Sequence, residues 1–312
     1  MSGCKAFTLT RLAGAAAVLL ALSSAAQAAD DFRVTYAGSM GVVMDKALGP
    51  AFARENKVNY QGQGQGAYGM ANLLASKKVV ADVFVSVTPG PIAVLQKAGL
   101  VDHAVPVAST SMVIAWNPKG KYAAQFNAIR DHQQGAKAWW QVLQTPSLRF
   151  GRTDPATDPQ GQNIIFTMLL ASRYYQQPDL ANKVLGDVQN PQQVFAEGGL
   201  LTRLEAGQID AASGYESATR SAHLPYITLP DEINLSDPSL DKEWYSRVSF
   251  DITDAKGQKK TLHTQPLVFY AAVLKNAPHP EMAQKFVQFM QGKEGQTLLQ
   301  NHGYGAPKGG AM

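Results

Sequence analysis

The stretch "RFGRTDPATDPQGQNIIF", residues 149–166, combines the end of a strand, a loop with two Asp-Pro steps and the start of an apolar helix. The first backbone N–H groups of a helix have no partner within the helix, so this start is a candidate anion site. Asp154 and Asp158 place two carboxylates beside it. A function assigned to this chain must therefore explain negative charge next to an anion cradle.

The rest of the chain alternates short apolar runs with segments of helical spacing. The runs that predict strands are "FRVTYAGS", "ADVFVSV", "SMVIAW", "LRFG" and "PLVFYAAVL". The segments that predict helices are "GVVMDKALGPAFAREN", "AYGMANLLASKK", "GQNIIFTMLLASRYYQQ", "GGLLTRLEAGQ" and the C-terminal "HPEMAQKFVQFMQGKEGQTLLQNHG". Such alternation predicts an α/β fold with largely parallel sheets, whose ligands bind at the carboxyl ends of strands.

The N-terminal 28 residues have the pattern of a secretory signal peptide. Lys5 and Arg11 precede or open an apolar run that is too short for a membrane span, and Ala26-Gln27-Ala28 forms a cleavage site. Cys4 lies before this run, so the exported chain is expected to contain no cysteine. Without the two signal cations, 26 basic residues face 24 acidic ones, which argues against nucleic acid or a membrane surface as partner.

Four strand-to-helix junctions carry serine or glycine, which let a ligand approach the backbone closely. They are Ser39 in "TYAGSMGVV", the Gly-rich "QGQGQG" that is read as a turn, the 149–166 loop, and Gly198 in "AEGGLLTRL". Each alone is also what an ordinary helix start would show. The final "GAPKGGAM" is expected to be a loose tail.

Other motifs favour no competing function strongly. Residues 64–69 match G-x-G-x-x-G, but Asp82 precedes its strand instead of following it, which disfavours a dinucleotide site. The six histidines show no metal-ligand spacing. Ser39 and His103 could serve an exported hydrolase, although no G-x-S-x-G elbow supports that alternative.

Several segments together resemble the periplasmic binding proteins for tungstate and molybdate, and the archaeal-type branch more than the classical bacterial molybdate binders. The segments are "VTYAGSM", "ADVFVS", "STSMVIAWNPKGKYA", "RFGRTDPATDPQGQN", "YITLPDEINLSDP" and "VFYAAVLKNAPHPEMAQKFVQFMQGKEGQTLL". The resemblance covers nearly all of residues 32–307, and the two Asp-Pro-rich segments are its most specific parts.

The resemblance implies a two-lobed α/β protein of the type II periplasmic binding fold. Residues 29–112 and 266–312 are expected to form lobe 1, and residues 113–265 lobe 2. The implied function is capture of a small oxyanion and its delivery to an ABC transporter permease in the inner membrane. The chain would act as a periplasmic monomer, without enzymatic activity and without a cofactor.

The resemblance also implies ligand-binding positions. Ser39 corresponds to the family's first serine, while Gly66-Ala67 stands where a second serine is expected, so only backbone N–H groups remain there. Asp158, with Asp154 as second choice, corresponds to the aspartate of the archaeal-type members. Gln160 and Gly161 follow it at the helix start.

Two further positions lie near "SGYESA". Tyr215 matches a tyrosine that contacts the anion in the classical molybdate binders. The family's glutamate is usually placed where this chain has Gly214, so Glu216 is the substitute expected. Asp158 and Glu216 would act as metal ligands only toward the tungsten or molybdenum of the bound oxyanion.

Three explanations for the Asp158 carboxylate remain open at this stage. It bonds to the metal centre of tungstate or molybdate, it accepts a proton from an anion such as hydrogen phosphate, or it caps the helix and pairs with Arg152 outside the site. For Asp154, capping or ion pairing is the favoured role. A binder of sulfate, phosphate or another small anion is the alternative within the class.

Overall fold

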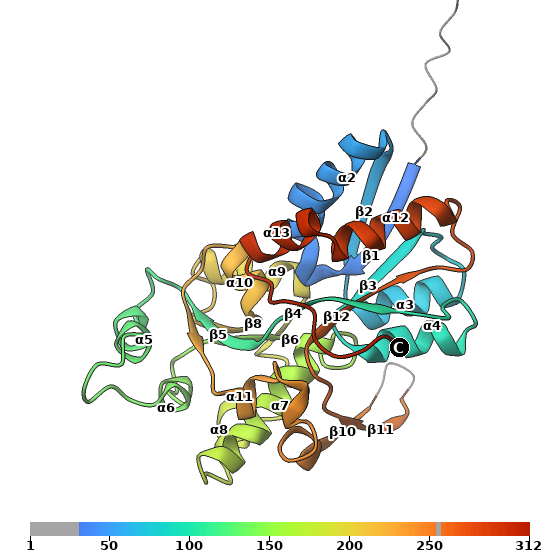
Figure 1. Ribbon diagram of the computed structural model, residues 1–312. Coiled ribbons are helices and arrows are strands. Elements are labelled where there is room, and N and C mark those ends of the chain that lie inside the picture. Colours follow the sequence, from blue (N-terminus) through green and yellow to red (C-terminus); the bar gives the residue numbers. More distant parts are fainter. Residues whose placement is uncertain (1–30, 254–256) are drawn as a thin grey trace, which may run out of the picture.

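The computed structural model describes residues 31–253 and 257–312, and the predicted signal peptide lies outside this range. The described chain forms two α/β lobes, each built on a five-stranded sheet with helices on both faces (Figure 1). The predicted two-lobed α/β class is confirmed. Within the described residues no helix is long and apolar enough to cross a membrane.

The sheet of lobe 1 has the strand order β2-β1-β3-β12-β4. Its strands are β1 (Asp31–Ala37), β2 (Asn59–Gln65), β3 (Val83–Ser86), β4 (Val105–Ser109) and β12 (Val268–Val273). Its helical segments are η1 (Gly38–Met40), α1 (Gly41–Val43), the π-helical η2 (Met44–Leu48), α2 (Gly49–Asn56), α3 (Ala67–Ala75), α4 (Pro89–Lys97), α12 (Pro280–Gln291) and α13 (Lys293–Asn301). Figure 1 shows α2, α12 and α13 on one face and α3 and α4 on the other.

The sheet of lobe 2 has the order β7-β6-β8-β5-β9. Its strands are β5 (Met112–Trp116), β6 (Phe150–Thr153), β7 (Val194–Phe195), β8 (Ala211–Tyr215) and β9 (Tyr226–Thr228). Its helices are α5 (Ala123–Arg130), α6 (Trp139–Leu143), α7 (Pro159–Tyr174), α8 (Leu180–Leu185), α9 (Glu197–Glu205), α10 (Glu216–Ser221) and α11 (Asp231–Asn234). Two short turns, η3 (Pro238–Leu240) and η4 (Tyr245–Arg247), lead to the hairpin of β10 (Ser249–Thr253) and β11 (Lys259–His263).

Both sheets are mixed but mostly parallel in strand direction, as predicted, because in each sheet one strand runs opposite to the other four. In lobe 1, β2, β1 and β3 are parallel, whereas β12 is antiparallel to both β3 and β4. In lobe 2, β7, β6 and β8 are parallel, whereas β5 is antiparallel to β8 and β9. The antiparallel strands β5 and β12 are those that directly follow the passages of the chain between the lobes. Strands β1, β2 and β6 lead into η1, α3 and α7, whose starts line cavities that also contain residues of the other lobe.

The chain crosses between the lobes at two adjacent places. Only Thr110 and Ser111 separate β4 of lobe 1 from β5 of lobe 2, and residues 264–267 lead back to β12. The Thr110 backbone N–H donates to the Leu267 carbonyl oxygen at 3.1 Å, so the two crossings are hydrogen-bonded to each other. The lobes are therefore joined by a narrow two-stranded connection.

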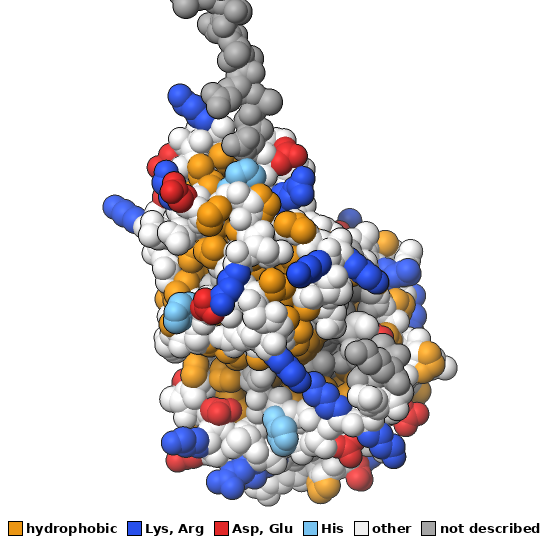
Figure 2. Space-filling model, turned by 90° about the vertical axis from the view of Figure 1, so that its right-hand side faces the viewer, with side chains coloured by type: hydrophobic (Ala, Val, Ile, Leu, Met, Phe, Trp, Pro, Cys, Tyr) orange, Lys and Arg blue, Asp and Glu red, His pale blue; other side chains and the backbone are white. Residues whose placement is uncertain are grey.

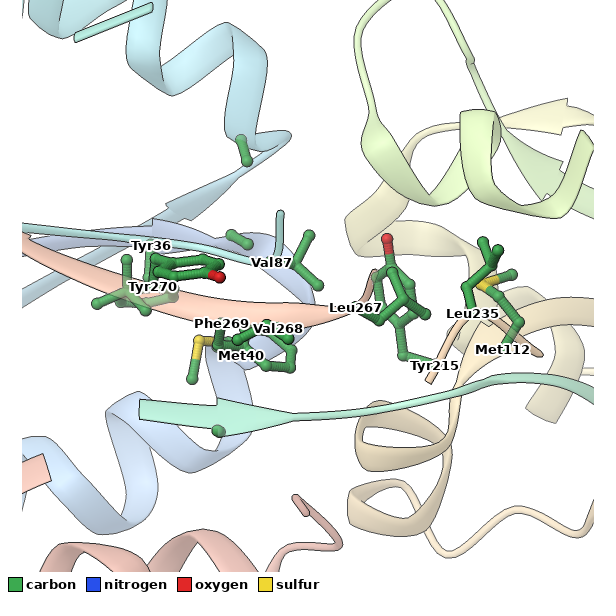
Figure 3. Packing of buried hydrophobic residues seen from close by; sticks show 14 of the residues in the cluster. Tyr36, Met40, Val87, Met112, Tyr215, Leu235, Leu267, Val268, Phe269 and Tyr270 are labelled. Atoms are coloured by element: carbon green, nitrogen blue, oxygen red, sulfur yellow. The ribbon is translucent and has the colours of Figure 1, made fainter. Parts of the chain in front are cut away.

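The hydrophobic core continues through this connection. One cluster of buried side chains contains residues of both lobes. In Figure 3, Tyr36, Phe269 and Tyr270 lie on one side, and Met112, Tyr215 and Leu235 on the other, with Leu267 beside the latter group. Burial of shared apolar surface therefore holds the lobes together at the connection.

The "QGQGQG" segment is a strand and not the turn that the sequence suggested. Residues 61–65 lie in β2 at the edge of the lobe 1 sheet, where Gln61 and Gln63 are exposed, and Gly66 follows the strand. Gly64 pairs with Tyr36 in the register, and a Cβ at Gly64 would lie 2.5 Å from the Tyr36 ring. The glycines of this strand thus make room for neighbouring side chains.

The "GAPKGGAM" tail is also not loose, contrary to expectation. Met312 exchanges two backbone hydrogen bonds with Ala104, of 2.9 and 3.1 Å, and Gly305 pairs with Ser109.

On the face shown in Figure 2, Lys and Arg side chains are dispersed over both lobes with acidic side chains between them.

Candidate functional site

The site is built at the start of α7, where the 149–166 segment folds as a strand, a tight loop and a helix. Asp154 Oδ1 accepts a hydrogen bond from the Ala156 backbone N–H at 2.9 Å, so this carboxylate closes the loop. Asp158 is the N-cap of α7, and its Oδ1 accepts from the Gln160 backbone N–H at 2.9 Å. The two aspartates thus have different local positions, the first in the loop and the second at the helix start.

The Asp158 carboxyl group is almost completely removed from water. Only 4% of the residue is exposed. Its second oxygen, Oδ2, is buried and forms no hydrogen bond of good geometry with the described residues, although the Thr153 hydroxyl lies close enough to affect its titration. Burial raises the pKa of Asp158 to about 6, while the Gln160 backbone N–H and the nearby Thr153 hydroxyl act in the opposite direction. One carboxylate oxygen therefore has no well-aligned partner among the described residues.

Gly66 of lobe 1 packs directly on this loop. A Cβ placed at Gly66 would lie 3.0 Å from the Thr157 carbonyl oxygen and 3.9 Å from the Asp158 Cβ. Gly66 is also the N-cap of α3, whose first residue, Ala67, is buried. The helix starts of α3 and α7, from opposite lobes, therefore meet at Asp158.

Ser39, at the first strand-to-helix junction of lobe 1, lies at another cavity between the lobes. It lies in η1 directly after β1, and it lines a cavity of about 570 Å³ together with Gln160 of α7. The other walls of this cavity come from α1 and η2 of lobe 1 and from α9 and α10 of lobe 2. Gln160 is 4% exposed, and its Oε1 has no hydrogen-bond partner in the described structure. A small ligand between Ser39 and Gln160 would touch both lobes.

Gly161 serves packing within the loop. A Cβ at this position would collide with the Thr153 carbonyl oxygen and lie 2.7 Å from the Pro155 nitrogen. Only glycine lets α7 begin this close to the preceding strand end. The tight approach is what brings Thr153, Asp158 and Gln160 together.

The remaining predicted positions, Tyr215, Glu216 and Gly198, lie in lobe 2, and the side chains of Tyr215 and Glu216 are hydrogen-bonded to other residues of the chain. Tyr215, fully buried at the end of β8, accepts a hydrogen bond from Asn163 of α7 at 3.1 Å. Both carboxylate oxygens of Glu216 are engaged, Oε2 by the Ser111 hydroxyl at 2.9 Å and Oε1 by the Tyr226 hydroxyl at 3.2 Å. Gly198 lies in α9. Ser39 and Gln160 thus line one cavity between the lobes, and Gly66 and Asp158 line another. The Glu216 carboxylate lies at the lobe connection.

Arg152 does not pair with the carboxylates, which corrects one of the three explanations for Asp158. Its fully buried guanidinium donates to Gln193 Oε1 at 3.0 Å and to the carbonyl oxygens of Val188 and Asp187 at 2.8 Å each. Burial lowers the pKa of Arg152 to about 10. This side chain fixes the loop that precedes β7.

Sequence reasoning missed Thr153 and Asn163 as parts of this site. Thr153 ends β6 with a buried hydroxyl beside Asp158, and Asn163 holds the Tyr215 hydroxyl. The available signal was a polar residue in an otherwise apolar context, as in "QNIIF".

The whole-chain comparison decides the family. The model of the bacterial extracellular solute-binding protein family matches residues 32–305. The chain belongs to this family. Its members are binding proteins, so this chain is an extracytoplasmic solute-binding protein.

Individual relatives add detail. The molybdate/tungstate-binding protein WtpA of Thermococcus kodakarensis is 29% identical over 275 residues, which cover 81% of this chain and 75% of WtpA. The periplasmic molybdate-binding protein of Azotobacter vinelandii has the same fold, with a TM-score of 0.62 and 13% identity. The match covers 89% of this chain and 100% of the Azotobacter protein. The sulfate-binding protein SubI of Mycobacterium tuberculosis also shares this fold, with a TM-score of 0.56 and 16% identity. The match covers 88% of this chain and 86% of SubI. The resemblance seen in the sequence is confirmed, and the fold alone does not select the anion.

A first prediction concerns the close packing at Gly161. Gly161→Ala should lower the free energy of unfolding by about 1–3 kcal/mol, because all three atoms nearest the new Cβ belong to the backbone and α7 must shift. Urea denaturation measures this change. Gly41→Ala is the control, since its Cβ would meet nothing within 4 Å and its φ of −51° is helical. Equal stability of the two variants would contradict the packing role.

A second prediction concerns the ionisation of Asp158 without ligand. Its folded-state pKa lies above the value of about 3.9 for an unfolded chain, so the folded state binds the proton more tightly. Stability from this group is present below about pH 4 and is lost as the pH rises through about 6. Asp158→Asn keeps a good N-cap and should be more stable than wild type at pH 7.5 by on the order of 2 kcal/mol.

The measurement is the difference in unfolding free energy between the two proteins from pH 4 to pH 8. The two should be similar at pH 4 and diverge toward pH 7. A constant difference over this range would show that the Asp158 carboxyl is not shifted.

Proposed function

We propose that this protein captures tungstate or molybdate in the cleft between its lobes and delivers it to the permease of an ABC transporter. The observation that carries the proposal is the buried Asp158 carboxylate, which offers one oxygen to a ligand at an anion-binding helix start. Relatives named as molybdate/tungstate-binding proteins support the same anions.

The donors of the site fit a tetrahedral oxyanion. Ser39 and Gln160 line one cavity between the lobes, and the starts of α3 and α7 meet beside a second cavity lined by Gly66 and Asp158. The proposed site draws its donors from the Ser39 hydroxyl, the Gln160 side-chain amide N–H and the backbone N–H groups of these helix starts. These groups are donors held in place by the fold, and in a site without bulk water they stabilise an anion strongly. Ala67 supplies no hydroxyl, so the α3 start contributes through its backbone.

Asp158 gives the site its selectivity. A carboxylate repels a sulfate ion in a poorly hydrated cleft because both carry negative charge. Sulfur does not readily expand its coordination, so no bond to the carboxylate offsets this repulsion. Tungsten and molybdenum accept additional oxygen ligands, so bonding to Asp158 Oδ2 would turn this repulsion into attraction. The Glu216 carboxylate is bound by Ser111 and Tyr226 and is a weaker candidate for a second ligand.

The same orphan oxygen also supports one second candidate. Hydrogen phosphate carries a proton that Asp158 Oδ2 could accept, so a phosphate-type anion would satisfy the same atom. Catalysis is a weaker interpretation, because no histidine is among the described residues that line the Ser39 cavity.

The proposal includes the protein's location and state. We infer export by the N-terminal signal peptide, function as a periplasmic monomer, and a membrane permease as the partner. No cofactor is needed for capture and release of an anion.

The test is calorimetric titration of wild type and Asp158→Asn with tungstate, molybdate, sulfate and phosphate. Wild type should bind tungstate and molybdate, and Asp158→Asn should lose at least tenfold in affinity for both while sulfate binding, if present, stays the same or improves. Ser39→Ala is the control for a general donor and should weaken every bound anion by about 5- to 150-fold, or 1–3 kcal/mol. Equal tungstate affinity of wild type and Asp158→Asn would contradict the proposal, and selective loss of phosphate would favour the second candidate.

A further inference from the structure

The segment after α13, residues 302–312, runs along the connection between the lobes. In Figure 1 it leaves α13 beside α10 and passes the crossing strands β4 and β12. Gly305 exchanges two backbone hydrogen bonds with Ser109, the last residue of β4, at 2.9 and 3.0 Å. The Ser109 hydroxyl also donates to the Ala306 carbonyl oxygen at 2.7 Å. This segment is thus fixed to lobe 1 at the point where the chain leaves that lobe.

The same segment is also bonded to lobe 2. The Ser221 hydroxyl at the end of α10 donates to the His302 carbonyl oxygen at 2.9 Å. Lys308 Nζ donates to the Ser236 carbonyl oxygen, just after α11, at 2.9 Å. Gly303, at φ +84°, lies so close to Arg220 that a Cβ there would be 2.8 Å from the arginine side chain. Contacts on both sides of the connection therefore join the lobes outside the two crossings.

One residue of the segment reaches the ligand-binding junction. The Tyr304 hydroxyl donates to the Ser39 carbonyl oxygen at 3.3 Å. Tyr304 is 4% exposed, and its ring packs edge-on against Phe269 of β12 with a centroid distance of 5.2 Å. The orientation of the Ser39 turn is therefore coupled to this segment.

We propose that residues 302–308 form an interlobe strap that stabilises the closed arrangement of the lobes, and that Tyr304 is a positioning residue for Ser39. The expected effect on anion affinity rests on the proposed function, whereas the expected effect on lobe closure does not. The polar contacts of the strap with lobe 2 are the Ser221–His302 and Lys308–Ser236 hydrogen bonds, which close a path from α10 through the strap to α11.

Loss of these two bonds should shift the protein toward an open form. A ligand that binds across both lobes has an apparent affinity equal to its affinity for the closed form multiplied by the fraction of protein that is closed. The double variant Ser221→Ala/Lys308→Met should therefore weaken tungstate and molybdate by the same factor, about three- to tenfold, through faster dissociation. Anion selectivity should not change, because no strap residue is proposed to touch the anion. Ser221 also lines the Ser39 cavity, so the lobe distance measured without ligand, and not the affinity alone, decides the strap.

The matched control removes two similar bonds that stay within one lobe. Ser246→Ala loses a serine hydrogen bond to the Lys242 carbonyl oxygen within lobe 2, and Lys275→Met loses an ion pair with Asp102 within lobe 1. This control pair should match wild type in both lobe closure and anion dissociation.

Lobe closure is measured without ligand by the distance between spin labels on cysteines introduced at Glu55 and Lys137, which are exposed positions on different lobes, in a Cys4→Ser background. The strap variant should show a larger population at long distance than wild type and the control variant. Distances identical to those of wild type would overturn the strap. If no oxyanion binds at all, the proposed function fails while this distance measurement still decides the strap.

Tyr304→Phe separates positioning from closure. It removes the donor to the Ser39 carbonyl and keeps the ring against Phe269. Tungstate affinity should fall severalfold while the label distances stay as in wild type. Unchanged affinity in Tyr304→Phe would overturn the positioning role.

Discussion

The burial of one carboxylate where two helix starts meet is the constraint on which the rest of this structure depends. Asp158 must be at the N-cap of α7 to hold the Gln160 N–H, and the Gly66 junction covers it from the other lobe. Burial without a cation costs free energy, as the raised pKa shows. This cost is offset only when the buried Oδ2 atom of the carboxylate has a partner. That is why the carboxylate is interpreted as a ligand and not as a cap alone.

The surrounding fold supplies what such a site requires. The tight start of α7, made possible by Gly161, fixes Asp158 and Gln160 relative to the strand end, and Arg152 fixes the neighbouring loop. The narrow connection at Thr110 and Leu267 lets the two halves of the site belong to different lobes. An anion that contacts both lobes shifts the protein toward the closed arrangement. A transporter can then distinguish the ligand-bound protein from the empty one by the relative position of the lobes.

Much of this arrangement could be predicted from the sequence. Apolar runs such as "MVIAW" are buried strands, and the Asp-Pro loop before an apolar helix correctly marked the N-cap at Asp158. Edge strand β2 was missed because its glutamines and glycines have low strand propensity, and its structure depends on pairing with β1. The fixed tail and the Glu216 contacts depend on residues more than 100 positions apart, Ser109 with Ala306 and Ser111 with Glu216, which local patterns do not reveal.

The central claim is that Asp158 bonds to the metal of the bound oxyanion, and the coordination of tungsten in the complex tests it most directly. X-ray absorption at the tungsten edge, recorded on the wild-type complex and on Asp158→Asn at saturating tungstate, gives the number of oxygen neighbours. The account predicts more than four oxygens around tungsten in the wild type and four in Asp158→Asn. Four oxygens in both proteins would contradict it and would leave Asp158 as a helix cap beside an ordinary anion site.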